Sequence, residues 1–531
     1  MPYRPYTAPA ARLIGYDPVV DLASDHLARL VERSVEAALG TPWRASGPGQ
    51  PPYDPRLCLK VLVYGYATGI RSSRQLERLC RENLAFLFLT RGDTPSYRTL
   101  CTARLELQEQ FEQVWVGLFS FAEHAGIKRV GRITVDSTKM RANASAESVV
   151  TAKEMARIRQ ELAGILAEAE AVDAREDAEG AAVETQLGVE VSTEQIRDIL
   201  RQVRHQMRKE KEAAGSEEPA RATKPSAKKP SKKKESPEGQ LGLSLGRRIS
   251  GRMRRRLSES IQALDTAQAA GLKHISLTDP DARMMSEGCQ KRIRECHSYE
   301  VAADEGLLIA GQTTQVGPDN ARLEPLVAAA GRNEPEGVTA VTADSGYYSG
   351  GSVAALEAGG VDTCIPDAHT AGDLHRGFPV GTLRSKGRGS VPFAYDAERD
   401  VYVCPQSNVL GLEQRRREGG QDVKVYHAQR ECVGCPLAAC CLTQKRARRR
   451  VLKVRVDHAV LEAARRRFEE PDHRKRYRHR AEQVETVFGF LRGVLGYTQW
   501  MLRGARRVAC EASLFNLAYQ LRKVQAASVT A

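Results

Sequence analysis

Two segments of the chain place an aspartate after an apolar, β-branched run. Residues 133–135 precede Asp136, and residues 338–343 precede Asp344, with a glycine two positions later. Runs of this type predict buried strands, with each carboxylate at a strand end. Carboxylate oxygens are ligands that Mg²⁺ prefers, and carboxylates held close together need a cation or a proton between them.

A third carboxylate comes from a segment near the C-terminus with helical periodicity. Val484, Phe488 and Leu491 share one face, and Glu485 lies beside that face. Glu482 is on the same helix and remains an alternative. Three carboxylates with open metal positions suit the two-metal chemistry that cleaves and joins phosphodiesters, in which two ions about 4 Å apart flank the phosphate. The expected elements are therefore two strands and one helix that converge on a metal site.

These segments resemble the DDE transposases of bacterial insertion sequences, in particular the subgroup with an Asp-Gly-Thr-Lys block that ends in Ala-Asn-Ala-Ser. Here the block runs over residues 136–145, with Ser137 in place of the glycine. The second-strand motif of the family, with Asn and Gln, is represented by Ser298 and Glu300. Similarity extends over most of the chain, with further family-like blocks at residues 53–55, 72–77, 95–99 and 278–283.

The resemblance implies an RNase H-like core with the catalytic triad Asp136, Asp344 and Glu485. Asp136 would bridge two Mg²⁺ ions, for which Mn²⁺ can substitute, and the other two carboxylates would each complete one ion. It also implies DNA as the partner, bound at terminal inverted repeats and at a target, and a homodimer in synapsis.

Contacts to DNA are implied by the family pattern Tyr-x2-Arg-x3-Glu-x6-Lys. Tyr477 and Arg480 keep the first spacing, Arg492 occupies the lysine position, and the interval between the arginine and Glu485 is one residue longer. In the N-terminal region, Arg71 and Arg74 are candidates for phosphate contacts.

Charge is concentrated in one part of the chain. The 531 residues carry a formal net charge of +14, and residues 445–480 contain fifteen Lys or Arg against five Asp or Glu. This local excess lies directly before Glu485 and favours a polyanionic partner over a merely solvated face. No run of eighteen apolar residues exists, and the first residues lack the apolar core of a signal peptide. We expect a cytoplasmic protein that acts at the nucleoid.

The fold class expected is α/β, with an RNase H-like mixed sheet, an N-terminal all-helical domain and two insertions. The predicted divisions are a helical DNA-binding domain at 1–130, a catalytic core, a helical insertion at 149–267 with a disordered Lys, Pro and Ser linker around 215–239, and a Cys-containing insertion with a basic segment at 373–475. The core comprises residues 131–148, 268–372 and 476–531.

Local patterns predict individual elements within these divisions. Stripes at 57–70 and 76–89 predict N-terminal helices, and those at 158–166 and 196–203 predict an antiparallel helical hairpin. Residues 299–303 and 307–314 read as strands joined by a tight turn at Asp304-Glu305-Gly306, and a helix is expected around 321–330.

Cysteines gather in the second insertion. Cys404 precedes a Cys-x-x-Cys pair, Cys432 and Cys435, which is followed by Cys440 and Cys441. Cys404, Cys432, Cys435 and Cys440, or Cys441 in its place, form the ligand set of a structural zinc site. Reduced unliganded thiols or another metal are the alternatives. Four thiolates leave no open coordination position, so such a site would not catalyse.

The function predicted is that of an insertion-sequence transposase, which binds the ends of its element, cleaves them and joins them to target DNA by Mg²⁺-dependent hydrolysis and transesterification. Two alternatives remain. One is a metal-dependent DNA nuclease without strand transfer, and the other is an inactive DNA-binding regulator derived from a transposase.

Overall fold

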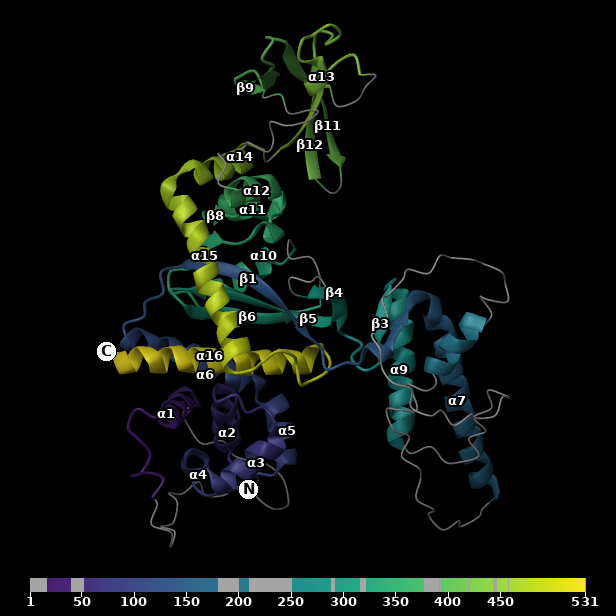
Figure 1. Ribbon diagram of the computed structural model, residues 1–531, viewed down its shortest axis with the longest axis vertical. Helices are drawn as coiled ribbons and strands as arrows, with labels where there is room; N and C mark the ends of the chain where they lie inside the picture. Colours follow the sequence, from purple (N-terminus) through teal and green to yellow (C-terminus); the bar gives the residue numbers. More distant parts are fainter. Residues whose placement is uncertain are drawn as a thin grey trace, which may run out of the picture. The chain divides into compact units, whose positions relative to one another are not determined.

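The computed structural model divides the chain into two compact units, Met1–Met140 with His297–Ala531 and Arg141–Cys296 (Figure 1). It describes residues 17–39, 52–179, 200–209, 251–287, 292–315, 321–376, 391, 393–396, 398–418, 421–442, 447–456 and 458–530. The predicted linker at 215–239 lies outside these described residues.

The N-terminal region is helical, as predicted. Its helices are α1 (Leu27–Leu39), α2 (Pro55–Ala67), α3 (Ser73–Glu82), α4 (Leu84–Thr90), α5 (Tyr97–Glu106) and α6 (Gln108–His124). The single helix expected over 76–89 is wrong, because Asn83 interrupts it. The Asn83 side chain accepts hydrogen bonds from the N–H groups of Ala85 and Phe86, and an asparagine that caps a new helix in this way ends the preceding one.

A mixed sheet forms the centre of the fold and confirms the α/β prediction. Its strands run in the order β4-β5-β1-β7-β8, with β6 beside β5. The bounds are β1 (Arg132–Arg141), β4 (Arg283–Glu287), β5 (Arg292–Asp304), β6 (Leu307–Thr314), β7 (Ala340–Thr342) and β8 (Asp362–Cys364). β1, β7 and β8 are parallel, whereas β5 is antiparallel to β4 and β6. Helices α10 (Leu323–Gly331), α11 (Gly350–Ala358) and α12 (Ala368–Arg376) follow β6, β7 and β8 in the chain.

The turn between β5 and β6 is the one that the residues predict. Glu305 and Gly306 have φ of 48° and 76°, and two successive positive φ values characterise the two-residue turn that matches the twist of a hairpin. The turn pairs Asp304 with Leu307 and sets the register of the strands on either side.

Helix α16 (Ala505–Thr530) packs against the N-terminal helices and the sheet, with contacts to α2, α6 and β6. The close approach to β6 needs a glycine, because a Cβ on Gly311 would lie 2.2 Å from Asn516 Oδ1. Asn516 also accepts the hydroxyl of Tyr299 at 2.5 Å and donates to Gly311 O at 2.9 Å. Polar side chains therefore fix the register of α16 against the sheet.

A buried carboxylate on the same helix ties the N-terminal region to the C-terminal region. Glu511 is fully buried and accepts hydrogen bonds from Arg71 Nη1 at 3.1 Å and from the N–H groups of Met501 and Leu502. Burial raises the pKa of Glu511, and the N–H donors and the charge of Arg71 oppose that shift. Removal of the carboxylate would leave a mostly buried guanidinium and two N–H groups without this acceptor.

We expect Glu511→Ala to lower the free energy of unfolding by about 3 kcal/mol or more, the usual cost of removing one member of a buried ion pair. Urea unfolding followed by circular dichroism measures this change. Glu82→Ala is the control, since Glu82 forms an exposed i, i+4 pair with Arg78 and should change stability by only about 0.5 kcal/mol. Equal losses in the two variants would contradict the assigned role of Glu511.

Two buried carboxyl groups lie at the start of β1. Asp304 Oδ2 accepts the N–H groups of Val130 and Gly131 at 2.5 and 2.9 Å. Glu334, only 5% exposed, is electrostatically coupled to it. Burial, followed by the charge of Asp304, raises the pKa of Glu334 to about 7, although Arg129 opposes the shift. The folded state therefore favours the protonated form of Glu334.

Because its pKa is raised on folding, Glu334 contributes most to stability below its ordinary pKa of 4.5, and this contribution is lost as the pH rises through about 7. We expect Glu334→Gln to reduce this loss, because the amide stays neutral. Melting temperatures measured across this pH range test the prediction. The exposed neighbour Glu336, changed to Gln, should leave the wild-type pH profile unaltered, and an unchanged profile in Glu334→Gln would refute the prediction.

The second unit is mainly helical. It contains β2 (Val149–Thr151), β3 (His274–Ser276), α7 (Ala152–Glu179), α9 (Gly251–Ala269) and a helix at 200–209. Ile158, Leu162, Leu200 and Val203 lie in one buried cluster, which agrees with the predicted packing of two helical segments. The same cluster includes Leu257 and Leu264 of α9, so a third helix completes this core.

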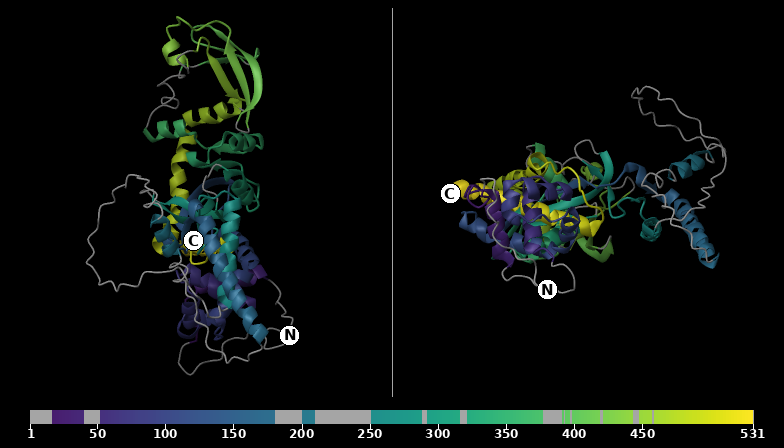
Figure 2. Two further views of the ribbon diagram at one scale, coloured as in Figure 1. Left: turned by 90° about the vertical axis from the view of Figure 1, so that its right-hand side faces the viewer. Right: turned by 90° about the horizontal axis from the view of Figure 1, so that it is seen from below.

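The Cys-containing insertion forms an antiparallel sheet in the order β13-β12-β11-β10-β9, visible as green strands in the left view of Figure 2. The strands are β9 (Ala394–Asp396), β10 (Val401–Val403), β11 (Val409–Glu418), β12 (Gln421–Ala428) and β13 (Val451–Arg455), with the short helix α13 (Ala438–Cys441) between β12 and β13. Helices α14 (His458–Arg466) and α15 (Pro471–Gly489) follow, and a π-helical segment, η6 (Phe490–Val494), extends α15.

Candidate active site

Asp136 and Asp344 lie at corresponding positions of neighbouring parallel strands. The β1–β7 register sets Arg132 opposite Ala340 and Thr134 opposite Thr342. Asp136 and Asp344 follow two residues further along each chain, just beyond the last paired position. Because the chains run parallel, this register brings both carboxylates to the carboxyl end of β7. The strand-end position predicted for Asp136 is wrong, because β1 continues to Arg141, whereas Asp344 follows the end of β7 as predicted.

Local hydrogen bonds orient both carboxylates. Asp136 Oδ1 accepts the N–H of Ser137 at 2.7 Å. Asp344 caps a short 3₁₀ turn, η3 (Ser345–Tyr347), and its Oδ1 accepts the N–H of Gly346 at 3.0 Å. In both cases one carboxylate oxygen is held by backbone.

Helix α15 contributes a cation and a phenol to this edge of the sheet. Arg480 Nη1 lies 3.2 Å from Asp136 Oδ2, and both side chains are about four-fifths buried, with 20% and 22% exposed. Burial raises the pKa of the Tyr477 hydroxyl, the charges of Asp344 and Asp136 add to this shift, and Arg480 opposes it. Tyr477 therefore lies within the electrostatic reach of both aspartates and of the arginine.

The continuation of this helix contacts the far end of β1. Arg492, in η6, donates to the hydroxyl of Thr138, and its Nη2 lies 3.4 Å from Lys139 O. Lys139 Nζ donates to Ser137 Oγ at 2.8 Å. The residues after Asp136 are therefore held between the strand and the helix.

Glu485 is placed differently from the two aspartates. It is exposed, whereas Val484 and Val487 on the same helix are fully buried. Glu482, the alternative, has a side chain that is 75% exposed and accepts from His479 Nδ1 at 2.8 Å. Within the described ranges, no three or more His, Cys, Asp or Glu side chains are grouped so that they could hold a metal ion. The structure thus associates Asp136 with Arg480, near Tyr477 and Asp344, and leaves Glu485 at the surface.

The two aspartates offer hard oxygen donors, the kind of ligand that divalent cations prefer. The guanidinium of Arg480 already pairs with Asp136, so a divalent ion at Asp136 would have to replace this ion pair. Sequence reasoning assigned Arg480 to DNA and missed this ion pair. The only signal for it is the position of Arg480 one helical turn before the buried Val484, because residues one turn apart share a helix face.

The two N-terminal candidates differ in accessibility. Arg71 donates to Gln499 O at 2.7 Å, pairs with Glu511 and has its guanidinium 4.5 Å from the centre of the Tyr497 ring. The predicted phosphate contact of Arg71 is therefore corrected to a structural role, because its guanidinium is 13% exposed and already engaged. Arg74 is exposed and lies over Tyr97, which is compatible with a phosphate contact.

The cysteine candidates separate in a similar way. Cys404, Cys432, Cys435 and Cys441 line one cavity. Cys440 does not line it, and its thiol donates to Leu437 O at 3.3 Å. Adjacent helical residues point about 100° apart, so α13 can direct only one of its two cysteines into the cavity. Of the two, Cys441 replaces Cys440 as the fourth candidate ligand.

Comparison with known families decides the class of protein. Residues 403–525 match the family described as Transposase DDE domain, and residues 19–106 match the family described as Transposase domain (DUF772). Both matches support an insertion-sequence DDE transposase. This confirms the resemblance to the family and the RNase H-like core that the family implies, which the mixed sheet provides.

No curated protein and no solved structure matches the transposase. Among the helices that the structure describes, none has the length and apolar content needed to cross a membrane.

We expect Arg480→Gln to destabilise the transposase by about 1 kcal/mol and to increase its stabilisation by Mg²⁺ or Mn²⁺, because Asp136 loses its cation and a divalent ion can replace it. Thermal unfolding with and without the ion measures both effects. Arg478→Gln, a change at an exposed position of the same helix, is the matched control and should behave as wild type. If Arg480→Gln responded to the ions as wild type does, the aspartates would not form a cation site.

Proposed function

We propose that the transposase binds the terminal inverted repeats of its own element, cleaves the element ends and joins them to target DNA, with Asp136, Asp344 and Glu485 as the catalytic carboxylates. The observation that supports the proposal is the register of β1 and β7. It places Asp136 and Asp344 at corresponding positions, and Arg480 pairs with Asp136. The family match supports the reaction class.

The proposed role of the carboxylates is to hold Mg²⁺, or Mn²⁺ in its place, at the edge of the sheet. Bound divalent ions activate an oxygen nucleophile and stabilise the leaving oxygen and the charge that grows on the phosphate. Asp136 is the proposed shared ligand, and its bond from the Ser137 N–H keeps one oxygen oriented. Hydrolysis by water and attack by a freed 3′-hydroxyl are the same displacement with different nucleophiles, so one site serves both steps.

Glu485 is the proposed third carboxylate, in preference to Glu482. Glu482 is already engaged by His479, and Glu485 has no hydrogen bond or ion pair among the described residues. Glu482 and Glu485 are both exposed, so folding alone does not remove either carboxylate from water. The buried Val484 and Val487 fix the helix on which Glu485 is carried.

DNA contacts are proposed for the side of the site where α15 and η6 meet β1. Tyr477 and Arg480 lie beside the aspartates, and Arg492 is exposed next to Thr138. Arg74 offers a further contact from the N-terminal helices. Guanidinium groups bind phosphates with paired hydrogen bonds, which positions the strand without reading its sequence. We further propose that two copies act together as a homodimer in synapsis, close to the nucleoid.

Asp136→Ala, Asp344→Ala and Glu485→Ala should each reduce Mg²⁺-dependent cleavage by at least about a hundredfold, the scale seen when one group that stabilises the transition state is removed. Linear duplexes that carry the two flanks of the gene are the substrates, and gel assays measure cleavage. Glu482→Ala is the matched control and should retain activity. Electrophoretic shift assays should show that all four variants still bind the same duplexes.

Three outcomes separate the alternatives. Pre-cut ends incubated with a plasmid should yield joined products, and a protein that only cleaves would be a nuclease. Tight binding by the wild type without cleavage in Mg²⁺ or Mn²⁺ would indicate a regulator. Loss of activity in Glu482→Ala with full activity in Glu485→Ala would transfer the catalytic role to Glu482.

A further inference from the structure

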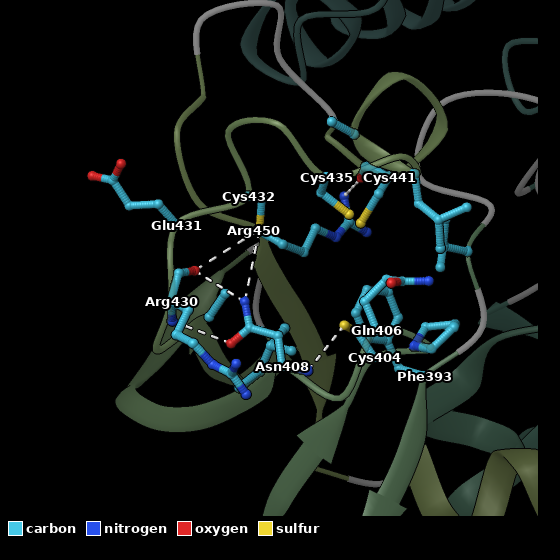
Figure 3. A pocket seen from close by; sticks show the side chains of 16 residues that line it. Phe393, Cys404, Gln406, Asn408, Arg430, Glu431, Cys432, Cys435, Cys441 and Arg450 are labelled. Carbon is cyan, nitrogen blue, oxygen red and sulfur yellow. Dashed lines mark hydrogen bonds between the residues drawn. The ribbon is translucent and has the colours of Figure 1, made fainter.

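One cavity of the Cys-containing insertion is surrounded by thiols. It has a volume of about 140 Å³, and its lining includes Cys404, Cys432, Cys435, Cys441 and Arg450 (Figure 3). These four cysteines therefore border one space. All of them are unpaired as disulfides. A set of four sulfur atoms around one small cavity is the ligand inventory of a tetrahedral thiolate site.

The first thiol is presented by the tight turn between β10 and β11. Ser407 has a φ of 56°, and its N–H donates to Cys404 O at 2.8 Å. The next N–H, that of Asn408, points at Cys404 Sγ at 3.3 Å. This N–H contact helps to fix the position of the Cys404 sulfur in the turn.

The second and third thiols come from the turn after β12. The N–H of Cys435 donates to Cys432 O at 3.3 Å, and Gly434 supplies the positive φ of 81° that the turn needs. The side-chain amide of Asn408 lies 4.0 Å from Cys432 Sγ, so one asparagine contacts sulfur atoms of both turns. The two turns thus approach one another with their sulfur atoms directed into the cavity.

A buried cation, Arg450, lines the same cavity. Arg450 is 7% exposed, its Nη1 donates to Cys441 O at 2.8 Å, and its Nε has no hydrogen-bond partner. Across the described part of the chain, no carboxylate forms an ion pair with Arg450. Figure 3 shows Arg450 and Cys441 at this cavity, and the two residues interact electrostatically. A buried guanidinium without an anion is costly, and a negatively charged centre bound in the cavity would offset that cost.

We propose that Cys404, Cys432, Cys435 and Cys441 bind one structural Zn²⁺. Binding would release the four thiol protons and give a tetrathiolate centre with a net charge of −2, which Arg450 would partly balance. The thiols do not stand at ligand spacing in this structure, so binding requires rotation of the side chains about their Cα–Cβ bonds. With four thiolates as ligands, the ion keeps no open position and takes no part in catalysis.

A metal would also account for the stability of an insertion with a small core. Among the residues of the insertion that the structure describes, the buried members of the apolar cluster are Tyr402, Leu410, Tyr426, Ala428, Cys432 and Val454. A core of this size rarely stabilises a sheet alone, and a structural metal is one of the common supplements. The proposed ion would join the turn after β10, the turn after β12 and helix α13.

The test is metal analysis of the purified full-length chain. Plasma mass spectrometry should find one Zn²⁺ per chain in the wild type and in Cys440→Ser, and a large loss in Cys441→Ser and Cys404→Ser. The pair Cys440→Ser and Cys441→Ser is closely matched, since the two residues are adjacent on α13 and only Cys441 lines the cavity.

A second measurement covers the case in which a serine variant does not fold. Wild-type chain loaded with Co²⁺ should show the intense visible and charge-transfer bands of a tetrahedral tetrathiolate complex, and chelation should lower the melting temperature. Absence of metal with the four thiols freely reactive, a Cys435–Cys441 disulfide, or equal metal loss in Cys440→Ser and Cys441→Ser would overturn the proposal. None of these readouts depends on DNA cleavage.

Discussion

The parallel pairing of β1 with β7 is the constraint on which the active site depends. β7 has only three paired residues, yet their register decides that Asp136 and Asp344 emerge together. A shift of one residue would turn one carboxylate to the opposite face of the sheet, because side chains alternate along a strand. The register is itself fixed near Gly131, whose carbonyl accepts the N–H groups of Thr339 and Ala340 and whose N–H donates to Asp304.

Two carboxylates brought close together repel one another. In this structure a cation from α15 reduces that repulsion. Arg480 supplies the counter-charge, and the helix that carries it is held by Val484 and Val487 in the core. The helix continues through η6 to Arg492, which contacts the residues after Asp136. The same helix thus positions the cation that balances the aspartates and carries Glu485, so any movement of α15 would change the charge of the site and its third proposed ligand together.

The sequence predicted those features that depend on neighbouring residues. The Asp304-Glu305-Gly306 turn is specified by its own residues, and the position of Asp344 after the end of β7 by the apolar run before it. The strand of Asp136 extends beyond its apolar run to Arg141, which the run alone does not predict. Asn83 shows where this fails: an asparagine inside an apolar stripe is compatible with a continuous helix, and only the packing of α3 and α4 reveals a cap. The structural role of Arg71 and the choice of Cys441 over Cys440 could not be predicted for a related reason. The burial of Arg71 beside Glu511 and the orientation of Cys441 into a cavity both depend on residues far away in the chain. Glu485 remains a prediction, because its surface position in the absence of DNA and metal does not test its role.

Not all of the positive charges in the basic segment before Glu485 are available to a binding partner, because several of them form ion pairs within the protein. Arg467 and Arg476 both pair with Asp362 at the start of β8, and Arg467 also contacts Glu357. Arg480 pairs with Asp136, and Arg450 is buried in the insertion. Several of the fifteen cations of residues 445–480 therefore fold the protein, and they join α14 and α15 to the sheet edge. The exposed remainder, such as Lys475 and Arg478, is the part that can meet a phosphate backbone. Part of the density of charge in this segment thus has a structural origin, because its arginines neutralise carboxylates of the sheet.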